Sequence, residues 1–229
     1  MPNGLKTGLL IFQAALFNKF LMKAICLAGY SGHGFVVAEI INLLQYKLIG
    51  YLDVTEKKNN PYNIPYVGDE NEIDGSIFES GDISFALGIG DNFIRRSVYK
   101  KLKNKNVSVE LLQHPAAMVS SLSLLHEGTV VMAAAVINPF SKIGRGVICN
   151  SGCIIEHECV VGDFTHVAPA AVLAGNVNVG ENTFIGANAF VRQGIHIGQN
   201  VVVGAGSVVT KNLPDNVVVY GNPAKIKKA

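Results

Sequence analysis

The chain has 229 residues, a formal net charge of +2 at pH 7 and 49% apolar residues. This length suffices for two modest domains. The near-neutral charge, with no long basic run before Lys225–Lys228, argues against nucleic acid or membrane surfaces as partners. The cysteines at positions 26, 149, 153 and 159 form no CxxC pair and no metal-like spacing, so we expect reduced structural thiols in a cytoplasmic protein.

Residues 1–21 are an N-terminal extension. Leu9–Phe17 is apolar, but Asn18 and Lys19 interrupt it, which leaves it too short to span a bilayer. Asn18–Met22 lacks the small-residue cleavage site of a signal peptide. We expect a start site upstream of the usual one or a short extension, and the alternative is a surface helix that docks on a partner or membrane.

Residues 22–113 alternate strands and helices, which predicts a Rossmann-like α/β domain with a small parallel sheet. The expected strands are Ala24–Ala28, Leu48–Leu52, Ile83–Leu87 and Val107–Leu112, and the expected helices are Phe35–Gln45 and Phe93–Lys103. The segment Lys57–Gly68 is rich in Asn, Pro and Tyr and is expected to be a loop.

A glycine turn, Gly29-Tyr30-Ser31-Gly32-His33-Gly34, follows the first strand and opens the first helix. Glycines in this context let backbone N–H groups approach a phosphate, although the spacing is G-x-x-G-x-G and a purely structural turn is an equal alternative. Asp53 ends the second strand, where an acid is placed to bind a ribose or sugar hydroxyl, and this favours a ligand site. His33 is expected to contact substrate; the alternative is a solvated turn histidine.

From Val119 to Val209, every sixth residue is aliphatic without one insertion, apart from Cys149, which packs as a small hydrophobe. A period of six fits neither an α-helix nor an alternating strand, but it is typical of a parallel β-helix. Glycines 144, 162, 180 and 198 stand 18 apart, so three hexads make one triangular coil and these glycines stack at one corner. We predict a β-helix over residues 114–229, with a last strand at Val217–Tyr220 and a C-terminal tail.

The motif Glu156-His157-Glu158 interrupts the apolar rule of the hexads, and His166 follows nine residues after His157. Histidine titrates near neutral pH and a carboxylate neighbour raises its basicity, which suits a general base. A solvated histidine on a coil edge is the alternative. Because successive strand residues face opposite sides, Glu158 supports His157 only at or around a corner.

Together, these motifs resemble the PglD/NeuD-type sugar acetyltransferases of the left-handed β-helix acyltransferase superfamily. The resemblance rests on the hexads, the string from Asn150 to Asp163 with His166, the closing Gly221-Asn222-Pro223-Ala224-Lys225, the Ser31–Gly34 turn and the Gly88–Asn92 turn. It implies a left-handed β-helix, which the period itself does not define. It also implies acetyl-CoA-dependent acetylation of the 4-amino group of a UDP-linked 4-amino-4,6-dideoxy sugar, on the way to diacetylated bacillosamine for protein glycosylation.

The resemblance implies a role for each candidate residue. His157 is the general base, and Glu158 increases its basicity. The implied nucleotide-sugar contacts are Ser31, Gly32, His33, Asp53 and Gly90, and the implied acetyl-CoA contacts are His166, Ala187 and Ala205, with the N–H of Gly175 as oxyanion donor. Metal is not implied, and the family's β-helices form homotrimers with acetyl-CoA between neighbours. Tyr30 departs from the small residue usual before Ser31, whereas His157-Glu158 favours the UDP-sugar branch.

Several other functions fit parts of the sequence. An O-acetyltransferase acting on sialic acid or another sugar, and a non-catalytic scaffold that binds a nucleotide sugar, stay open as alternatives. A γ-carbonic anhydrase-like metalloenzyme is disfavoured, because His126, His157, His166 and His196 never stand 18 apart. Transferases that use acyl carrier protein lack the N-terminal sheet domain.

Overall fold

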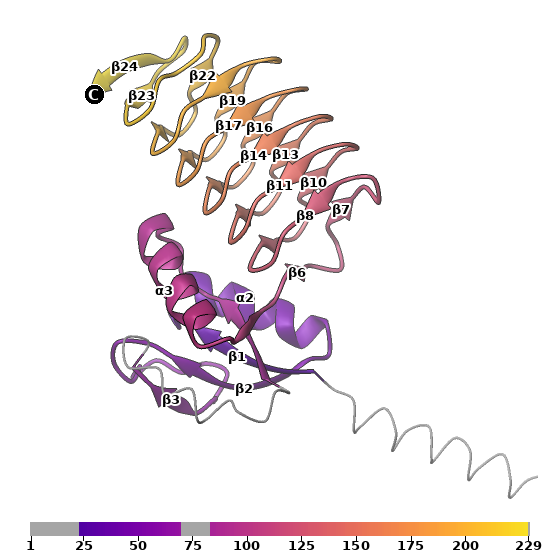
Figure 1. The fold of residues 1–229 in the computed structure, drawn as a ribbon, viewed down its shortest axis with the longest axis vertical. Helices are drawn as coiled ribbons and strands as arrows, with labels where there is room; N and C mark the ends of the chain where they lie inside the picture. The colour runs from indigo at the N-terminus through magenta and orange to yellow at the C-terminus, as the bar shows by residue number, and fades with distance from the viewer. Residues whose placement is uncertain (1–22, 70–82, 229) are drawn as a thin grey trace, which may run out of the picture.

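The computed structural model describes residues 23–69 and 83–228, so the expected extension 1–21 lies outside the described residues. Figure 1 shows a sheet domain at one end and a stack of β coils that rises from it, with the C-terminus at the far end. None of the helices within the described ranges is long and apolar enough to cross a membrane.

The sheet domain contains a five-stranded parallel sheet in the order β3-β2-β1-β4-β5. Its elements are β1 Ala24–Ala28, α2 Gly32–Leu43, β2 Lys47–Leu52, β3 Tyr66–Gly68, β4 Ile83–Leu87, α3 Asn92–Asn104 and β5 Ser108–Val109. The predicted Rossmann-like domain is confirmed. The loop expected over residues 57–68 was wrong at its end, where β3 pairs with the edge of β2.

Alternate residues of β1 serve opposite faces of this sheet, as the pleat requires. Ile25 and Leu27 pack in a cluster with α2, whereas Cys26 and Ala28 pack in a cluster with α3. Both clusters continue into the β-helix, since Met132 and Ile148 join the first and Phe164 joins the second. The two domains therefore share buried surface.

The β-helix has three parallel faces. Face 1 consists of β6 Leu112–Gln113, β9 Val130–Val131, β12 Ile148–Cys149, β15 His166–Val167, β18 Phe184–Ile185, β21 Val202–Val203 and β23 Val218–Tyr220. Face 2 consists of β7 Met118–Val119, β10 Val136–Ile137, β13 Ile154–Ile155, β16 Val172–Leu173, β19 Phe190–Val191 and β22 Val208–Val209. Face 3 consists of β8 Leu124–Leu125, β11 Lys142–Ile143, β14 Val160–Val161, β17 Asn178–Val179 and β20 His196–Ile197. We name each corner by the faces it joins: corner 1–2, corner 2–3 and corner 3–1.

The hexad series forms the interior of the β-helix, as predicted. The second residue of each short strand points inward and is buried from Val131 onward, while Val119 and Leu125 are partly buried at the first coil. Buried hydroxyls fill some of the small-residue positions, and Thr165 Oγ1 donates to Gly180 O at 2.8 Å. The stacked glycines are also confirmed, because a Cβ on Gly162 would lie 2.7 Å from Glu181 N.

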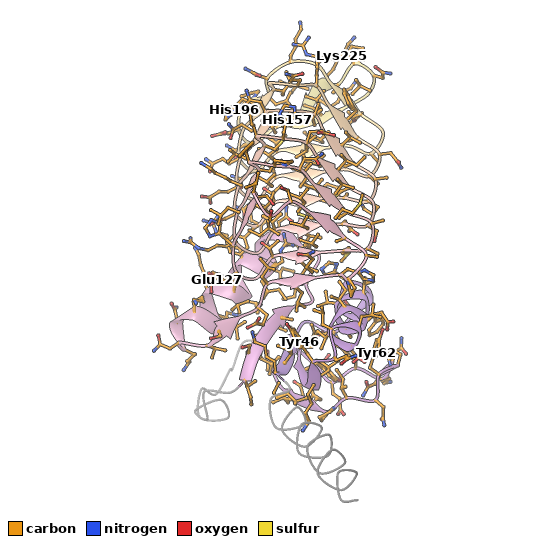
Figure 2. The ribbon with its side chains drawn as sticks, turned by 90° about the vertical axis from the view of Figure 1, so that its right-hand side faces the viewer. Tyr46, Tyr62, Glu127, His157, His196 and Lys225 are labelled. Atoms are coloured by element: carbon orange, nitrogen blue, oxygen red, sulfur yellow. The ribbon has the colours of Figure 1, made fainter. Side chains whose placement is uncertain are left out.

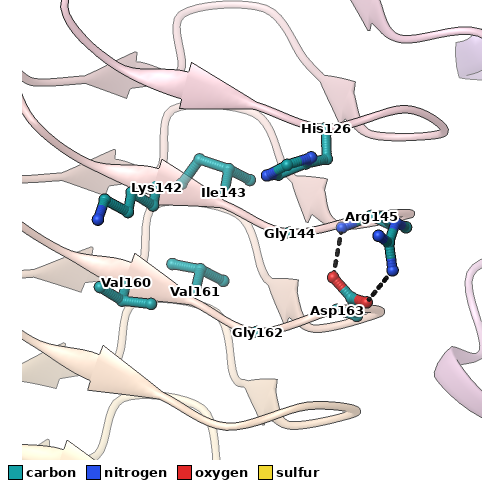
Figure 3. A pocket seen from close by; sticks show the side chains of 9 residues that line it. All are labelled: His126, Lys142, Ile143, Gly144, Arg145, Val160, Val161, Gly162 and Asp163. Atoms are coloured by element: carbon teal, nitrogen blue, oxygen red, sulfur yellow. Dashed lines mark hydrogen bonds and ion pairs between the residues drawn. The ribbon is translucent and has the colours of Figure 1, made fainter.

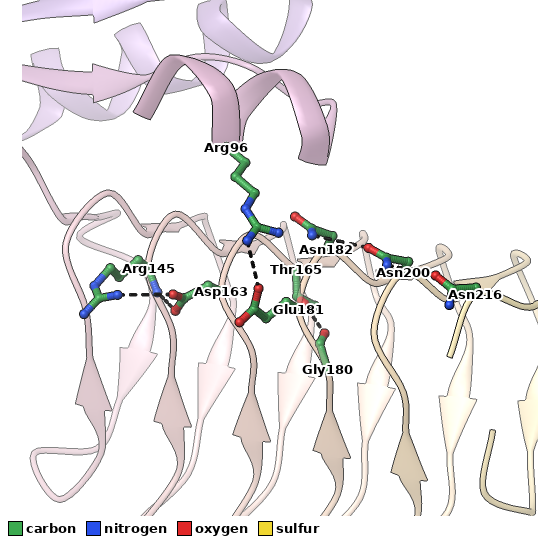
Figure 4. Close-up of polar contacts among 9 residues, drawn as sticks. All are labelled: Arg96, Arg145, Asp163, Thr165, Gly180, Glu181, Asn182, Asn200 and Asn216. Atoms are coloured by element: carbon green, nitrogen blue, oxygen red, sulfur yellow. Dashed lines mark hydrogen bonds and ion pairs between the residues drawn. The ribbon is translucent and has the colours of Figure 1, made fainter. Parts of the chain in front are cut away.

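Corner 3–1 is fastened by side chains of successive coils (Figure 4). Asn182 Nδ2 donates to Asn200 Oδ1 at 3.3 Å, and Asn200 Nδ2 donates to Asn216 Oδ1 at 2.9 Å. Their φ angles lie between +54° and +60°, a region that asparagine tolerates better than most residues. Arg96 of α3 pairs with Glu181 at 3.2 Å, which ties the sheet domain to this corner.

Several of the expected elements differ from those in the structure. Helix α2 begins at Gly32, three residues before the expected start. The single strand expected over Val107–Leu112 is divided between β5 of the sheet domain and β6 of face 1, because Leu112 N already donates to Thr129 O at 2.9 Å. An unexpected strand, β24 Lys225–Lys228, pairs antiparallel with β23.

Candidate active site at corner 2–3

His157 and Glu158 form corner 2–3 of their coil, between β13 and β14. Glu158 has a φ of +61°, which turns the chain sharply and lets neighbouring side chains meet. His157 Nδ1 lies 3.0 Å from Glu158 Oε2, and both side chains are at least half exposed. In the tautomer whose Nδ1–H donates to the carboxylate, Nε2 carries the lone pair. The expected corner geometry is confirmed.

Gly175 lies against the imidazole, one coil further along the same corner. A Cβ on Gly175 would lie 2.6 Å from both Cε1 and Nε2 of His157, so only glycine leaves room for the ring in this position. In the described part of the chain, the N–H of Gly175 has no hydrogen-bond acceptor, whereas Asn176 N donates to His157 O at 2.8 Å. A histidine and an unpaired backbone donor therefore stand side by side.

Polar contacts beneath this corner hold its backbone. Asn138 Nδ2 donates to Glu156 Oε2 at 2.9 Å, and Ser141 Oγ donates to Glu156 O at 2.7 Å. Cys159 N donates to the same Ser141 hydroxyl at 3.2 Å. The backbone on both sides of His157 is thus fixed by neighbouring coils, although its side chain is exposed.

The glycine turn of the sheet domain is a second candidate site. Ser31 precedes α2 and makes no capping side-chain bond, and it is exposed together with Gly32. A Cβ on Gly34 would lie 2.5 Å from Gly29 O, so this glycine is needed for the close approach of strand and helix. The exposed first turn of α2 therefore presents backbone N–H groups outward, as an anion site requires.

Asp53 supports the glycine turn through its own hydrogen bonds. Its Oδ2 accepts from Tyr30 N at 2.9 Å, and its Oδ1 accepts from Val54 N at 2.8 Å and pairs with Lys57 at 2.7 Å. The side chain is thus already engaged within the protein. Tyr30, the departure from the family pattern, is fully buried and stacks on Tyr51 with ring centroids 4.3 Å apart.

His33 and His166 meet where the sheet domain packs on face 1, with ring centroids 6.4 Å apart. His166 Nε2 lies 2.9 Å from Asn150 Nδ2. Burial, reinforced by the positive charge of Arg95, lowers the pKa of His33 to about 4 and that of His166 to about 3. Both imidazoles are therefore neutral at pH 7, and the Nε2 atom of His33 is buried without a partner among the described residues.

Arg95, which the sequence analysis did not single out, joins the two domains at this place. Its fully buried guanidinium donates to Gly146 O at 2.7 Å, Gly90 O at 2.9 Å and Phe164 O at 2.8 Å. Asn92 Nδ2 adds bonds to the carbonyls of Asn182 and Thr183. From the sequence, an arginine in a basic amphipathic helix is expected to be exposed to solvent. The sequence therefore does not indicate that Arg95 links the two domains.

The residues expected along the acetyl-CoA groove lie on different parts of the β-helix. Ala187 and Ala205 occupy corner 1–2 in adjacent coils, and Gly206 N donates to Ala187 O at 2.8 Å. His166 lies on face 1, and Gly175 lies on corner 2–3. A single chain does not bring these residues together. Figure 2 likewise shows His157 on the β-helix, well away from Tyr62 of the sheet domain.

Two hollows accompany these sites. One of about 280 Å³ lies between the sheet domain and face 1, and it is lined by Gly90, Asp91, Asn92, Phe93, Asn182, Phe184 and Val202. The other, of about 240 Å³, lies on face 3 around His126, Lys142 and the Arg145–Asp163 pair (Figure 3). Over residues 23–69 and 83–228, no cluster of three His, Cys, Asp or Glu side chains is arranged to hold a metal ion.

Two family models and a curated relative match parts of this chain. The PglD N-terminal domain model matches residues 24–102, and the hexapeptide repeat of succinyl-transferase model matches residues 176–211. A UDP-N-acetylbacillosamine N-acetyltransferase of Bacillus subtilis (strain 168) is 34% identical over 113 residues, which are 49% of this chain and about half (52%) of that protein's length.

Solved structures match over far more of the chain. The acetyltransferase domain of PglB from Neisseria gonorrhoeae FA1090, in complex with acetyl coenzyme A, is 33% identical with a TM-score of 0.82, covering 90% of this chain and 99% of that one. A histidine-to-asparagine variant of perosamine N-acetyltransferase from Caulobacter crescentus, in complex with CoA and GDP-perosamine, is 35% identical with a TM-score of 0.84, covering 90% and 97%.

The fold and its match to solved acetyltransferases define an acyltransferase of the left-handed parallel β-helix class. The sheet domain in front of the β-helix narrows that class further, because both solved relatives match across the two domains. The chain belongs to the PglD-type sugar N-acetyltransferase family.

Proposed function

We propose that the protein transfers the acetyl group of acetyl-CoA to the 4-amino group of a nucleotide-linked 4-amino-4,6-dideoxy sugar, UDP-linked, in bacterial glycan or glycoprotein synthesis. The observation that carries this proposal is the His157 ring, oriented by Glu158 and set against the unpaired N–H of Gly175. Relatives named for the N-acetylation of UDP-N-acetylbacillosamine and of perosamine support an amino sugar as acceptor.

The reaction is direct acyl transfer. The neutral form of the sugar amine attacks the thioester carbonyl, because a protonated amine has no lone pair, and the nitrogen loses one proton to Nε2 of His157 as the C–N bond forms. The oxyanion of the tetrahedral intermediate accepts a hydrogen bond from the N–H of Gly175. When the intermediate collapses, the C–S bond breaks and the CoA thiolate takes the proton from His157. Glu158 holds the tautomer in which Nε2 is the base.

The glycine turn is the proposed nucleotide-sugar site. The N–H groups at Ser31, Gly32 and His33 approach the diphosphate, and Gly90 borders the hollow between the domains. The carboxylate of Asp53 already binds Tyr30 N and Lys57, so Asp53 fixes the conformation of the turn. It would also bind a hydroxyl of the nucleotide sugar.

A homotrimer would complete the site. Ala187 and Ala205 lie on corner 1–2 while His157 lies on corner 2–3, so acetyl-CoA would reach both sets when it lies between two β-helices. Light scattering on the purified protein measures the assembly, and a stable, fully active monomer would refute this part of the proposal. We also place the protein in the cytoplasm, in keeping with four free, buried cysteines.

Thiol release from acetyl-CoA, measured against a panel of UDP- and GDP-linked 4-amino sugars, tests the activity. His157→Ala is expected to lower kcat by about 10²–10⁴-fold, the usual contribution of a general base. His196→Ala is the matched control, because it removes an exposed histidine from face 3 of the same β-helix. Hydroxylamine distinguishes the alternative product, since it cleaves O-acetyl esters and leaves N-acetyl amides intact. Unchanged turnover in His157→Ala would remove the histidine from the mechanism.

A further inference from the structure

Three bulky residues at the β-helix corners have left-handed backbone conformations. They are Phe140, Glu158 and Phe164, with φ angles of +64°, +61° and +58°; the other non-glycine corner residues with positive φ are asparagine or alanine. A large side chain is disfavoured in this region, and such outliers gather at functional sites.

Two of the three have an identifiable role. Glu158 orients His157 through the 3.0 Å contact described above. Phe164 is only 4% exposed and packs at the domain interface, with the Tyr99 ring centroid 5.2 Å away and the Arg96 guanidinium over its face at 5.8 Å. Phe140 is different, because it is 61% exposed and joins no hydrophobic cluster of the described residues.

Phe140 lies on the same corner as the candidate base, in the preceding coil. It belongs to corner 2–3 one coil before His157, and Glu158 N donates to Pro139 O at 3.1 Å across that step. In the order of the coils, Gly175 lies on the C-terminal side of His157, and the Pro139–Phe140 corner lies on the side nearer the sheet domain. Ala187 and Ala205, the proposed acetyl-CoA contacts on corner 1–2, belong to coils on the C-terminal side of Gly175, away from Phe140. The acceptor would then approach His157 from the Phe140 side.

We propose that Phe140 is an acceptor-binding residue whose ring packs against the apolar face of the sugar while the amine meets Nε2 of His157. This inference rests on the proposed function. A 4,6-dideoxy sugar presents a methyl group and C–H bonds, and an aromatic ring offers a flat apolar surface for them. The same ring would favour 6-deoxy acceptors over 6-hydroxy ones, since the hydroxyl would lose water against it.

Steady-state kinetics of Phe140→Asn and Phe140→Tyr test the proposal. Asparagine suits the left-handed conformation, so Phe140→Asn is expected to fold at least as stably as the parent protein. Its KM for the amino sugar is expected to rise roughly three- to tenfold, as for loss of one aromatic contact, with KM for acetyl-CoA unchanged. Phe140→Tyr keeps the ring and is expected to keep the parental KM. Ala134→Asn, at a similar left-handed backbone angle (φ +56°) on corner 1–2, is the matched control with unchanged kinetics.

The outcomes separate this inference from the proposed function. If the parent enzyme turns over an amino sugar and Phe140→Asn leaves its KM unchanged, Phe140 does not bind the acceptor. A variant that dissociates in light scattering would make Phe140 a contact between copies instead, and equal rises in both KM values would indicate a displaced corner; either result overturns the inference. If no amino sugar is acetylated by the parent enzyme, the proposed function itself has failed.

Discussion

Gly175→Ala is a severe test of the corner 2–3 geometry, because it perturbs His157 without altering any reacting group. The added Cβ would lie 2.6 Å from Cε1 and Nε2, whereas ordinary contacts are 3.4–4 Å, so the ring must shift by about 1 Å. The ring is half exposed and is free to move outward. A displacement of this size costs on the order of 10²-fold in rate when it misplaces a catalytic group.

Stability should move in the opposite direction. Gly175 does not have a positive φ, so alanine is expected to raise the free energy of unfolding by about 0.4–1 kcal/mol by restricting the unfolded chain. The expected variant is therefore a well-folded protein whose kcat falls about 10²-fold in the thiol-release assay. Gln193→Ala, at the equivalent corner position one coil further along, is the control with unchanged kcat.

A double variant isolates the cause. If Gly175→Ala acts only by moving the imidazole, it should add nothing to the loss already caused by His157→Ala, since both changes act through one group. Additive losses would point to the N–H of Gly175 as a separate contributor. Parental kcat in Gly175→Ala would refute the reasoning, because the observed ring position would then be irrelevant to catalysis.

Two further predictions concern the domain interface. Arg95→Met should lower the free energy of unfolding by about 3–5 kcal/mol, measured by urea denaturation, because it leaves buried carbonyls of both domains unpaired; a loss below about 1 kcal/mol would contradict the interface role. Acid should weaken the fold, because the unfolded chain binds protons near pH 6.5 that His33 and His166 accept only near pH 4 and 3 in the folded state. The free energy of unfolding should therefore be highest above pH 6.5 and fall by roughly 2–4 kcal/mol between pH 7 and 5. His166→Gln should reduce that dependence on pH by about half. A free energy of unfolding that does not change with pH would show that these histidines are hydrated.

The β-helix could be predicted from the sequence because its determinants are local and repeated. Each hexad specifies one inward aliphatic residue and one corner. One irregular hexad does not change the prediction, because the neighbouring hexads repeat the same pattern. The candidate base was predictable for the same reason, since His157 and Glu158 break a regular pattern. Ser31 and Gly32 were likewise visible as a turn between strand and helix.

The contacts between the domains were not predictable in this way. Arg95 looks like one more base on a surface helix, and its role depends on carbonyls at Gly146 and Phe164, more than 50 residues away. Strand β3 forms because β2 leaves an edge to pair with, which composition does not show. The strand expected over Val107–Leu112 is divided because its first part pairs with the sheet domain and its last part pairs with face 1.

The antiparallel strand β24 has a consequence for solubility. A parallel solenoid ends in exposed strand edges, and a second molecule can extend such an edge into a fibre. In face 1, β24 occupies the edge of β23 and runs against the direction of the coils, with Ile226 opposite Val219 and Lys225 opposite Tyr220. A following coil of another molecule finds neither the parallel register nor an uncharged surface there. Strand β24 thus covers the edge of face 1 and disfavours the end-to-end stacking of two β-helices along that face.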